Sequence, residues 1–197
     1  MTYQLVLGSS SKYRKKLLER LRLPFTCLSP EVDESRVGDE TPEAYVERIS
    51  KAKARAIIKD VDDQTIVITS DQCATFKDEI IGKPHTVERA AEQLLHFSGQ
   101  SVRFLTGLYV FNTATLEDYY ALAEYTVTFR DLTLEDVMRY VEAEQPLDCA
   151  GSFKCEQLGV ALFEKMAGDD PTSLEGLPLI ETCKALRVLG LDPLAKA

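Results

Sequence analysis

The chain has 197 residues, of which 45% are hydrophobic and 28% charged, and it carries a formal net charge of −9. This composition is typical of a globular domain, and the negative charge argues against broad nucleic-acid binding, which usually needs a strongly basic face. Five cysteines without a CxxC pair and only two histidines argue against a disulfide framework and a zinc site. No apolar run is long enough for a signal peptide or a membrane span. We therefore expect one cytoplasmic domain, residues 1–197, with no membrane partner; a homodimer is left open.

The residue pattern in the first half of the chain predicts alternating strands and helices. A strand at residues 3–7 leads through three serines into a basic amphipathic helix at 12–21, followed by a short strand at 25–28. The acidic stretch 29–40 is typical of turns. Thr41 as N-cap and Pro42 at the first helical position predict a helix to about residue 59. The β-branched run 64–70 predicts a buried central strand that ends at Asp71.

The second half predicts a hairpin between helices. Thr86 caps a helix that reaches about residue 97, and the two β-rich runs 102–111 and 119–129 predict an antiparallel hairpin. A capping box at 133–136 opens a helix that ends near residue 144. A strand at 159–165 and a helix at 178–189 complete the chain. We expect an α/β fold with a mixed, twisted sheet and flanking helices, rather than a purely doubly wound sheet.

The segment that joins the first strand to the first helix is a candidate anion site. Backbone N–H groups at a helix start favour an anion, and the serines of Gly8–Ser11 together with Arg14, Lys15 and Lys16 add donors and positive charge. The pattern GxxxxGK[ST] of a P-loop is absent. The alternative is a serine-capped surface helix with solvated bases, and this segment alone does not decide between the two.

Other polar segments are also candidates, each with an ordinary structural alternative. Asp71 follows an apolar strand, where α/β proteins bind ligands, although an aspartate also commonly starts a turn. Lys83 in Gly82-Lys83-Pro84 is an ammonium on a rigid turn. Residues 31–34 carry three carboxylates, and such a group is most often simply exposed to solvent. The loop 150–156 carries Lys154 and Glu156, and its structural alternative is an ordinary turn.

In order and spacing, these segments resemble one family over nearly the whole chain, the Maf-type (septum-formation-inhibitor-like) nucleotide pyrophosphatases. The resemblance implies a fold of two lobes around a cleft, like that of Ham1 and inosine triphosphate pyrophosphatases. It implies Asp71 as the proton acceptor and Glu34 with Asp71 as the metal ligands. The phosphate-binding residues that it implies are Ser9, Ser11, Arg14, Lys53 and Lys83. Lys53 is identified only through the resemblance, since a lysine on a helix is usually solvated.

Three further positions resemble one subgroup of the family. Tyr13, Gln72 and Glu156 match the aromatic residue, Gln and Glu of the 7-methyl-GTP pyrophosphatases, whereas the UTP and dTTP enzymes of the sister subgroup carry Arg, Thr and Gln. The match has departures, among them Lys12 in place of the usual Pro and Lys15 in place of a second Arg. Lys15 lacks the bidentate fork of the arginine that it replaces.

The resemblance implies a nucleoside triphosphate as substrate and a divalent cation, Mg²⁺ or Mn²⁺, as cofactor. Hard cations pair with carboxylate and phosphate oxygens, and a metal lowers the pKa of its water, which would help an aspartate whose ordinary pKa is about 3.9. For a cationic 7-methylguanine, Tyr13 offers an aromatic face and Glu156 an acceptor pair. A UTP or dTTP pyrophosphatase and a non-catalytic regulator of cell division stay open as alternatives.

Overall fold

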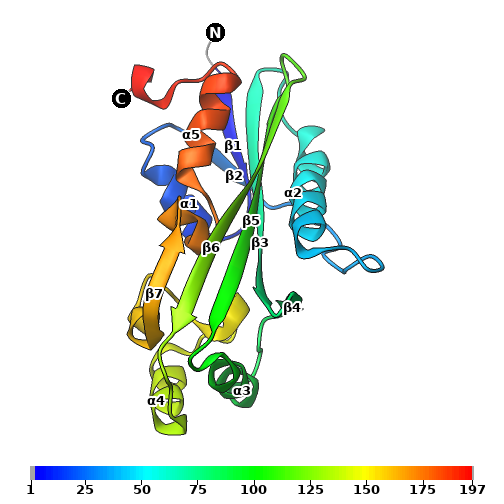
Figure 1. The fold of residues 1–197 in the computed structure, drawn as a ribbon. Coiled ribbons are helices and arrows are strands. Elements are labelled where there is room, and N and C mark those ends of the chain that lie inside the picture. The colour runs from blue at the N-terminus through cyan, green and yellow to red at the C-terminus, as the bar shows by residue number, and fades with distance from the viewer. Residues whose placement is uncertain (1–2, 197) are drawn as a thin grey trace. The chain divides into compact units, whose positions relative to one another are not determined.

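The computed structural model describes residues 3–196, and within them the chain forms helices, short 3-10 turns and a mixed sheet (Figure 1). The strands are β1 (Gln4–Gly8), β2 (Thr26–Leu28), β3 (Thr65–Phe76), β4 (Glu79–Ile81), β5 (Ser101–Asn112), β6 (Asp118–Phe129) and β7 (Phe163–Gly168). The helices are α1 (Lys12–Glu19), α2 (Pro42–Ile58), α3 (Val87–Phe97), α4 (Leu134–Glu144) and α5 (Leu179–Val188). The 3-10 turns are η1 (Ala150–Ser152), η2 (Leu158–Leu162), η3 (Pro171–Glu175) and η4 (Pro193–Lys196).

The sheet mixes parallel and antiparallel pairs, as expected. Its strand order among the described residues is β2-β1-β3-β5-β6-β7, with β4 paired to β3. β1 runs parallel to both β2 and β3, whereas β4 is antiparallel to β3 and β7 is antiparallel to β6. The predicted α/β class with a mixed sheet is therefore confirmed.

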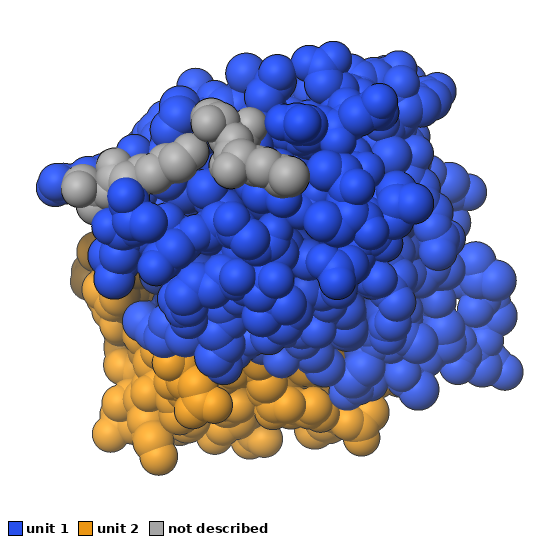
Figure 2. All heavy atoms as spheres, turned by 90° about the horizontal axis from the view of Figure 1, so that it is seen from above, with its two compact units in different colours: residues 1–72, 106–123, 170–197 blue, residues 73–105, 124–169 orange. Residues whose placement is uncertain are grey.

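Contacts divide the described chain into two compact units, coloured separately in Figure 2. Unit 1 comprises residues 1–72, 106–123 and 170–197, and unit 2 comprises residues 73–105 and 124–169. The chain changes unit inside β3, β5 and β6, so each of these strands contributes residues to both.

Unit 1 buries an apolar layer on each face of its strands. Leu5, Leu7, Ile66 and Ile68 pack with side chains of α1 and α5, while Val6 and Val67 pack with Ala54 and Ile57 of α2. Figure 1 shows α2 on one side of these strands and α1 with α5 on the other. Because successive side chains of a strand point to opposite faces, the odd-numbered residues of β3 from Val67 to Asp71 face α2, whereas Ile66 and Ile68 face α1 and α5.

Unit 2 has an aromatic core. Phe97 of α3, Phe129 of β6, Phe153 and Phe163 form a chain of rings whose neighbouring centroids lie 4.8–5.7 Å apart, mostly edge to face. Such pairs are favourable beyond their buried area, by about 0.5–1.5 kcal/mol each. Thr86 caps α3, and the capping box predicted for α4 is present between Thr133 and Asp136.

Three strand predictions need correction. β3 continues to Phe76 instead of ending at Asp71, and β4, which pairs with its last residues, was not predicted. The predicted strand at 159–165 is a 3-10 turn at 158–162, and β7 begins only at Phe163. The reason for the last difference is local packing: a Cβ at Gly159 would lie 2.4 Å from the Lys154 carbonyl oxygen, so the chain turns back on itself there.

Candidate active site

An ion-pair cluster in unit 1 brings together three of the residues that the sequence singles out. Lys53 on α2 is buried, and its Nζ lies 2.6 Å from Oδ1 of Asp71 and 2.8 Å from Oε1 of Glu34. Asp71 is buried as well, whereas the Glu34 side chain is half exposed. One ammonium therefore neutralises one of two carboxylates, and the cluster retains a negative charge. A buried charge of this kind is stable only when it is paired.

Asp71 does not end its strand, but it does lie where the parallel pairing of β1 with β3 has ended. The last paired residues are Leu7 of β1 and Ile68 of β3, three positions before Asp71. β1 ends at Gly8, which still pairs with Leu28 of β2, and a Cβ at Gly8 would lie 2.6 Å from Thr69 and 2.7 Å from Ile57. The side chains of Thr69 and Ile57 thus favour glycine at this position, and the Asp71 carboxylate still lies at the carboxyl end of the parallel strand pair, where α/β proteins bind ligands.

Lys53 lies on the buried face of α2. The buried residues of that helix are Val46, Ile49, Ser50, Lys53, Ala54 and Ile57, which follow helical spacing. A lysine on this mostly apolar face is the signal that could have identified Lys53 from the sequence, because a solvated lysine belongs on the opposite face.

The start of α1 is built as the serine and arginine pattern predicts. The Ser11 side chain caps the helix by accepting from the backbone N–H of Arg14 at 3.4 Å, and Ser9 Oγ accepts from the backbone N–H of Ser11 at 3.1 Å. Arg14 donates from Nε to the Gly176 carbonyl at 2.8 Å and from Nη1 to Ser9 Oγ at 3.5 Å. Burial lowers the pKa of Arg14, and the carboxylates of Asp71 and Glu34 oppose this by raising it. The guanidinium is therefore within electrostatic reach of the Lys53 cluster.

The segment that carries Glu34 is held against α2 by hydrogen bonds from Tyr45 and Arg48, two residues that the sequence did not indicate. The Tyr45 hydroxyl donates to the Glu34 carbonyl at 3.1 Å, and Arg48 donates to the Ser35 carbonyl at 3.0 Å. Arg48 also donates to both carboxylate oxygens of Glu40, through Nε at 2.8 Å and through Nη2. Planar bidentate pairing of this kind is among the stronger ion-pair geometries. Tyr45 and Arg48 precede Lys53 on one helix, and only the tertiary contact reveals their role.

Tyr13 and Gln72, the two specificity candidates of unit 1, have different surroundings. Tyr13 is half-buried on α1, with the Lys12 ammonium 5.1 Å from its ring centroid. The Gln72 amide nitrogen donates to Thr106 Oγ1 at 3.0 Å and to the carbonyls of Ser173 at 2.7 Å and Leu174 at 3.2 Å.

Lys83 and Glu156, the other predicted site residues, belong to unit 2. Lys83 is exposed and follows β4. Glu156 is exposed between η1 and η2, where the Cys155 thiol lies 3.7 Å from its Oε2. The structure therefore brings Glu34, Lys53 and Asp71 into direct contact within unit 1, and groups Ser9, Ser11 and Arg14 at the start of α1.

The two carboxylates of the ion-pair cluster are oxygen donors of the kind that a hard divalent cation prefers. Within residues 3–196 no three His, Cys, Asp or Glu side chains gather into a metal-binding group. Glu34 and Asp71 thus offer two carboxylates, and Mg²⁺ commonly binds proteins through one or two carboxylates together with substrate phosphates and water.

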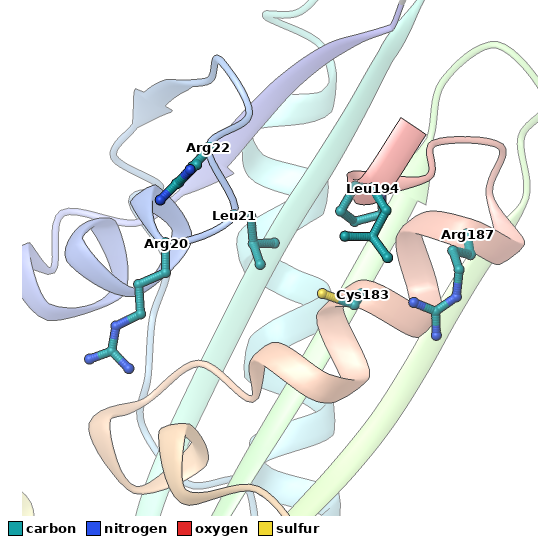
Figure 3. Close-up of a pocket in the computed structure, with 7 residues that line it drawn as sticks. Arg20, Leu21, Arg22, Cys183, Arg187 and Leu194 are labelled. Carbon is teal, nitrogen blue, oxygen red and sulfur yellow. The ribbon is translucent and has the colours of Figure 1, made fainter. Parts of the chain in front are cut away.

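A separate hollow of unit 1 contains none of the predicted site residues. It has a volume of about 400 Å³ and is lined by Arg20, Leu21, Arg22, Cys183, Arg187, Pro193 and Leu194. In Figure 3, Leu21, Cys183 and Leu194 face the hollow, and the guanidinium of Arg20 points away from it.

Comparison with known proteins identifies the family of this chain. The family model described as Maf-like protein matches residues 4–189. The chain belongs to the Maf family. Relatives of this Maf protein include a protein of Pseudoalteromonas translucida, 49% identical over 99% of this chain and 96% of its own length, and one of Vibrio cholerae, 50% identical over 96% and 97%. A third, from Pseudomonas putida, is 51% identical over 95% of this chain and 97% of its own. All three are described as 7-methyl-GTP pyrophosphatases.

Among solved structures, the Staphylococcus aureus Ham1 protein matches with a TM-score of 0.45 and 16% sequence identity, over 79% of this chain and 89% of its own. No helix among the described residues of this Maf protein is long and apolar enough to cross a membrane.

Proposed function

We propose that this Maf protein is a nucleoside triphosphate pyrophosphatase that hydrolyses 7-methyl-GTP to 7-methyl-GMP and pyrophosphate. The observation that carries the proposal is the buried Lys53 ammonium between Asp71 and Glu34, with the Arg14 guanidinium under the electrostatic influence of both carboxylates. Cations and carboxylates so close together suit a substrate of high negative charge and the water that attacks it. The names of the relatives support the choice of nucleotide.

Hydrolysis between the α- and β-phosphates needs a positioned water and a stabilised leaving group, and no covalent enzyme intermediate. Asp71 is the proposed acceptor of the water's proton, and Lys53, at 2.6 Å, fixes the orientation of its carboxylate. Arg14 and Lys53 on α1 and α2, and Lys83 after β4, are the proposed cations for the phosphates, with Ser9 and Ser11 adding donors. A divalent cation, when bound, would neutralise further phosphate charge and make a coordinated water more acidic.

Recognition of the base is proposed on chemical grounds. A 7-methylguanine ring is cationic, so it would gain a cation–π contribution of about 0.5–2 kcal/mol on the face of an aromatic ring such as Tyr13. The carboxylate of Glu156 can accept from the adjacent N1–H and N2–H donors of guanine, whereas uracil and thymine lack that donor pair.

Five free cysteines among the described residues support a reducing compartment, so we also propose that the protein works in the cytoplasm.

The decisive experiment measures pyrophosphate release from 7-methyl-GTP, GTP, UTP and dTTP by the purified protein in the presence of Mg²⁺ or Mn²⁺. We expect kcat/KM to be highest for 7-methyl-GTP. A preference for UTP or dTTP would place the protein in the sister subgroup, and the absence of release from all four nucleotides would favour a non-catalytic role.

A further inference from the structure

A short turn of unit 1, residues 173–176, collects hydrogen bonds from the residues on both sides of Asp71. Ser70 donates from Oγ to the Gly176 carbonyl at 2.8 Å, and Gln72 donates to the carbonyls of Ser173 at 2.7 Å and Leu174 at 3.2 Å. Ser70 and Gln72 are even-numbered residues of β3 and Asp71 is odd-numbered. Strand alternation therefore sends the two neighbours to this turn and the carboxylate to Lys53 on the α2 side.

The same turn holds Arg14. The Gly176 carbonyl that accepts from Ser70 also accepts from Arg14 Nε at 2.8 Å. Gly176 has a φ of +102°, and a Cβ there would lie 3.2 Å from Arg14 Nε, so both the backbone conformation and the contact favour glycine. Nε is occupied by the carbonyl and Nη1 makes only a long hydrogen bond, 3.5 Å, to Ser9 Oγ, so the terminal nitrogens are the ones that can donate to an anion.

The turn is itself well anchored. The Asp170 carboxylate accepts from the backbone N–H of Thr172 at 2.9 Å and from that of Ile180 at 2.7 Å. Thr106, fully buried on β5, donates to the Ser173 carbonyl at 2.9 Å. Because a buried carbonyl that loses its donor destabilises the fold, these bonds hold the turn in one conformation.

We infer that Ser70 and Gln72 are positioning residues for Arg14: they fix the carbonyls of residues 173–176, and the Gly176 carbonyl fixes the guanidinium that binds the substrate's phosphates. Gln72 therefore acts on the triphosphate through the turn and does not need to touch the base. The inference rests on the proposed function in one respect, the assignment of Arg14 as a phosphate ligand.

Binding of inorganic pyrophosphate, which has no base, separates the two roles of Gln72. Isothermal titration calorimetry in Mg²⁺ would compare the wild type with Gln72→Met, Ser70→Ala, Arg14→Met and the double variant Arg14→Met/Gln72→Met. We expect Gln72→Met and Ser70→Ala each to weaken binding by roughly 2–10-fold, the effect of losing one or two hydrogen bonds. We expect the double variant to bind no more weakly than Arg14→Met, because Gln72 would affect pyrophosphate only through Arg14.

Thr182→Val is the matched control. Thr182 is fully buried on α5 and donates to the Pro178 carbonyl at 2.7 Å, so its loss removes a comparable bond that does not reach Arg14. Its Tm should fall while pyrophosphate binding stays at the wild-type level.

Two results would overturn the inference. One is wild-type pyrophosphate binding in Gln72→Met; a changed ratio of kcat/KM for 7-methyl-GTP and UTP in that variant would show in addition that Gln72 reads the base directly. The other is wild-type binding in Arg14→Met, which would remove Arg14 from the phosphate site. If the wild type binds pyrophosphate but releases none from 7-methyl-GTP, the proposed function fails while the comparison of these variants still holds.

Discussion

At the scale of single residues, the proposed chemistry depends most on Asp71. Asp71→Asn keeps the size of the side chain but removes the charge that accepts a proton and pairs with Lys53 at 2.6 Å. We expect kcat to fall by about 10²–10⁴-fold, the usual contribution of a general base. Steady-state kinetics would measure the loss, and circular dichroism would check that the fold is retained. A variant with more than about a tenth of the wild-type kcat would exclude Asp71 as the base.

A second residue-scale prediction concerns the choice of base. Glu156→Gln replaces a double acceptor by one acceptor and one donor, so an NH₂ group would face an N–H of guanine. We expect kcat/KM for 7-methyl-GTP to fall by roughly 10–150-fold, corresponding to about 1.5–3 kcal/mol, while kcat/KM for UTP stays level or rises. An equal fall for both nucleotides would show that Glu156 supports its loop and does not read the base.

At the scale of elements, the segment from residue 29 to residue 40 shows how α2 holds an irregular loop. Hydrogen bonds from Arg48 lower the pKa of Glu40 from 4.5 to about 2. A carboxylate whose pKa is lower in the folded state stabilises the fold above its unfolded pKa, and this contribution is lost as the pH falls toward the folded pKa. The wild type should therefore lose stability between about pH 4.5 and pH 2 partly through Glu40.

Glu40→Gln tests this. The difference in unfolding free energy between wild type and Glu40→Gln, measured by urea denaturation, should be largest above pH 4.5 and shrink toward pH 2. Asp39→Asn, an exposed neighbour in the same segment, is the control. A difference that does not vary with pH would mean that the Arg48 pair does not contribute through the charge of Glu40.

Element prediction from the sequence succeeded where the signal is local. Thr41, Thr86 and Thr133 each cap the helix expected of them, because a cap is read from a few consecutive residues. The extent of β3 could not be read in this way, since its last residues pair with β4, a strand that the sequence did not indicate. The helix expected to reach residue 21 ends at Glu19, where Arg20 and Leu21 donate to carbonyls three residues back and Arg22 takes a positive φ.

For the site, too, local features could be predicted from the sequence, whereas long-range contacts could not. The cap of α1 by Ser11 follows from the pattern, and the contact of Lys53 with two carboxylates does not, because Glu34 and Asp71 lie 19 and 18 residues away from it along the chain. The role of Gly176 was equally inaccessible, since 162 residues separate it from Arg14. Such contacts depend on how strands and helices pack, and a single sequence does not record that packing.

At the scale of the whole molecule, a polyphosphate must bind to a protein that already has a net charge of −9. The two carboxylates proposed for a divalent cation both contact Lys53, so the protein alone offers little to a free metal ion. We therefore expect the cation and the phosphates to bind together, each supplying part of what the other needs.

Thermal unfolding tests this coupling. Millimolar Mg²⁺ alone should change the Tm by less than about 1 °C. Mg²⁺ with pyrophosphate at 100 times its Kd should stabilise the fold by about 2.7 kcal/mol, which corresponds to roughly 5–10 °C for a chain of this size. Pyrophosphate with EDTA should give little of that shift, and EDTA should also stop nucleotide hydrolysis. A full shift from Mg²⁺ alone would point to a metal site complete within the protein, and full activity after EDTA treatment would contradict the proposed cofactor.

A Lys53→Met variant provides a further test of this coupling. Without the ammonium, the carboxylates of Glu34 and Asp71 would repel each other and would therefore bind a free cation more readily. Mg²⁺ alone should then raise the Tm of this variant.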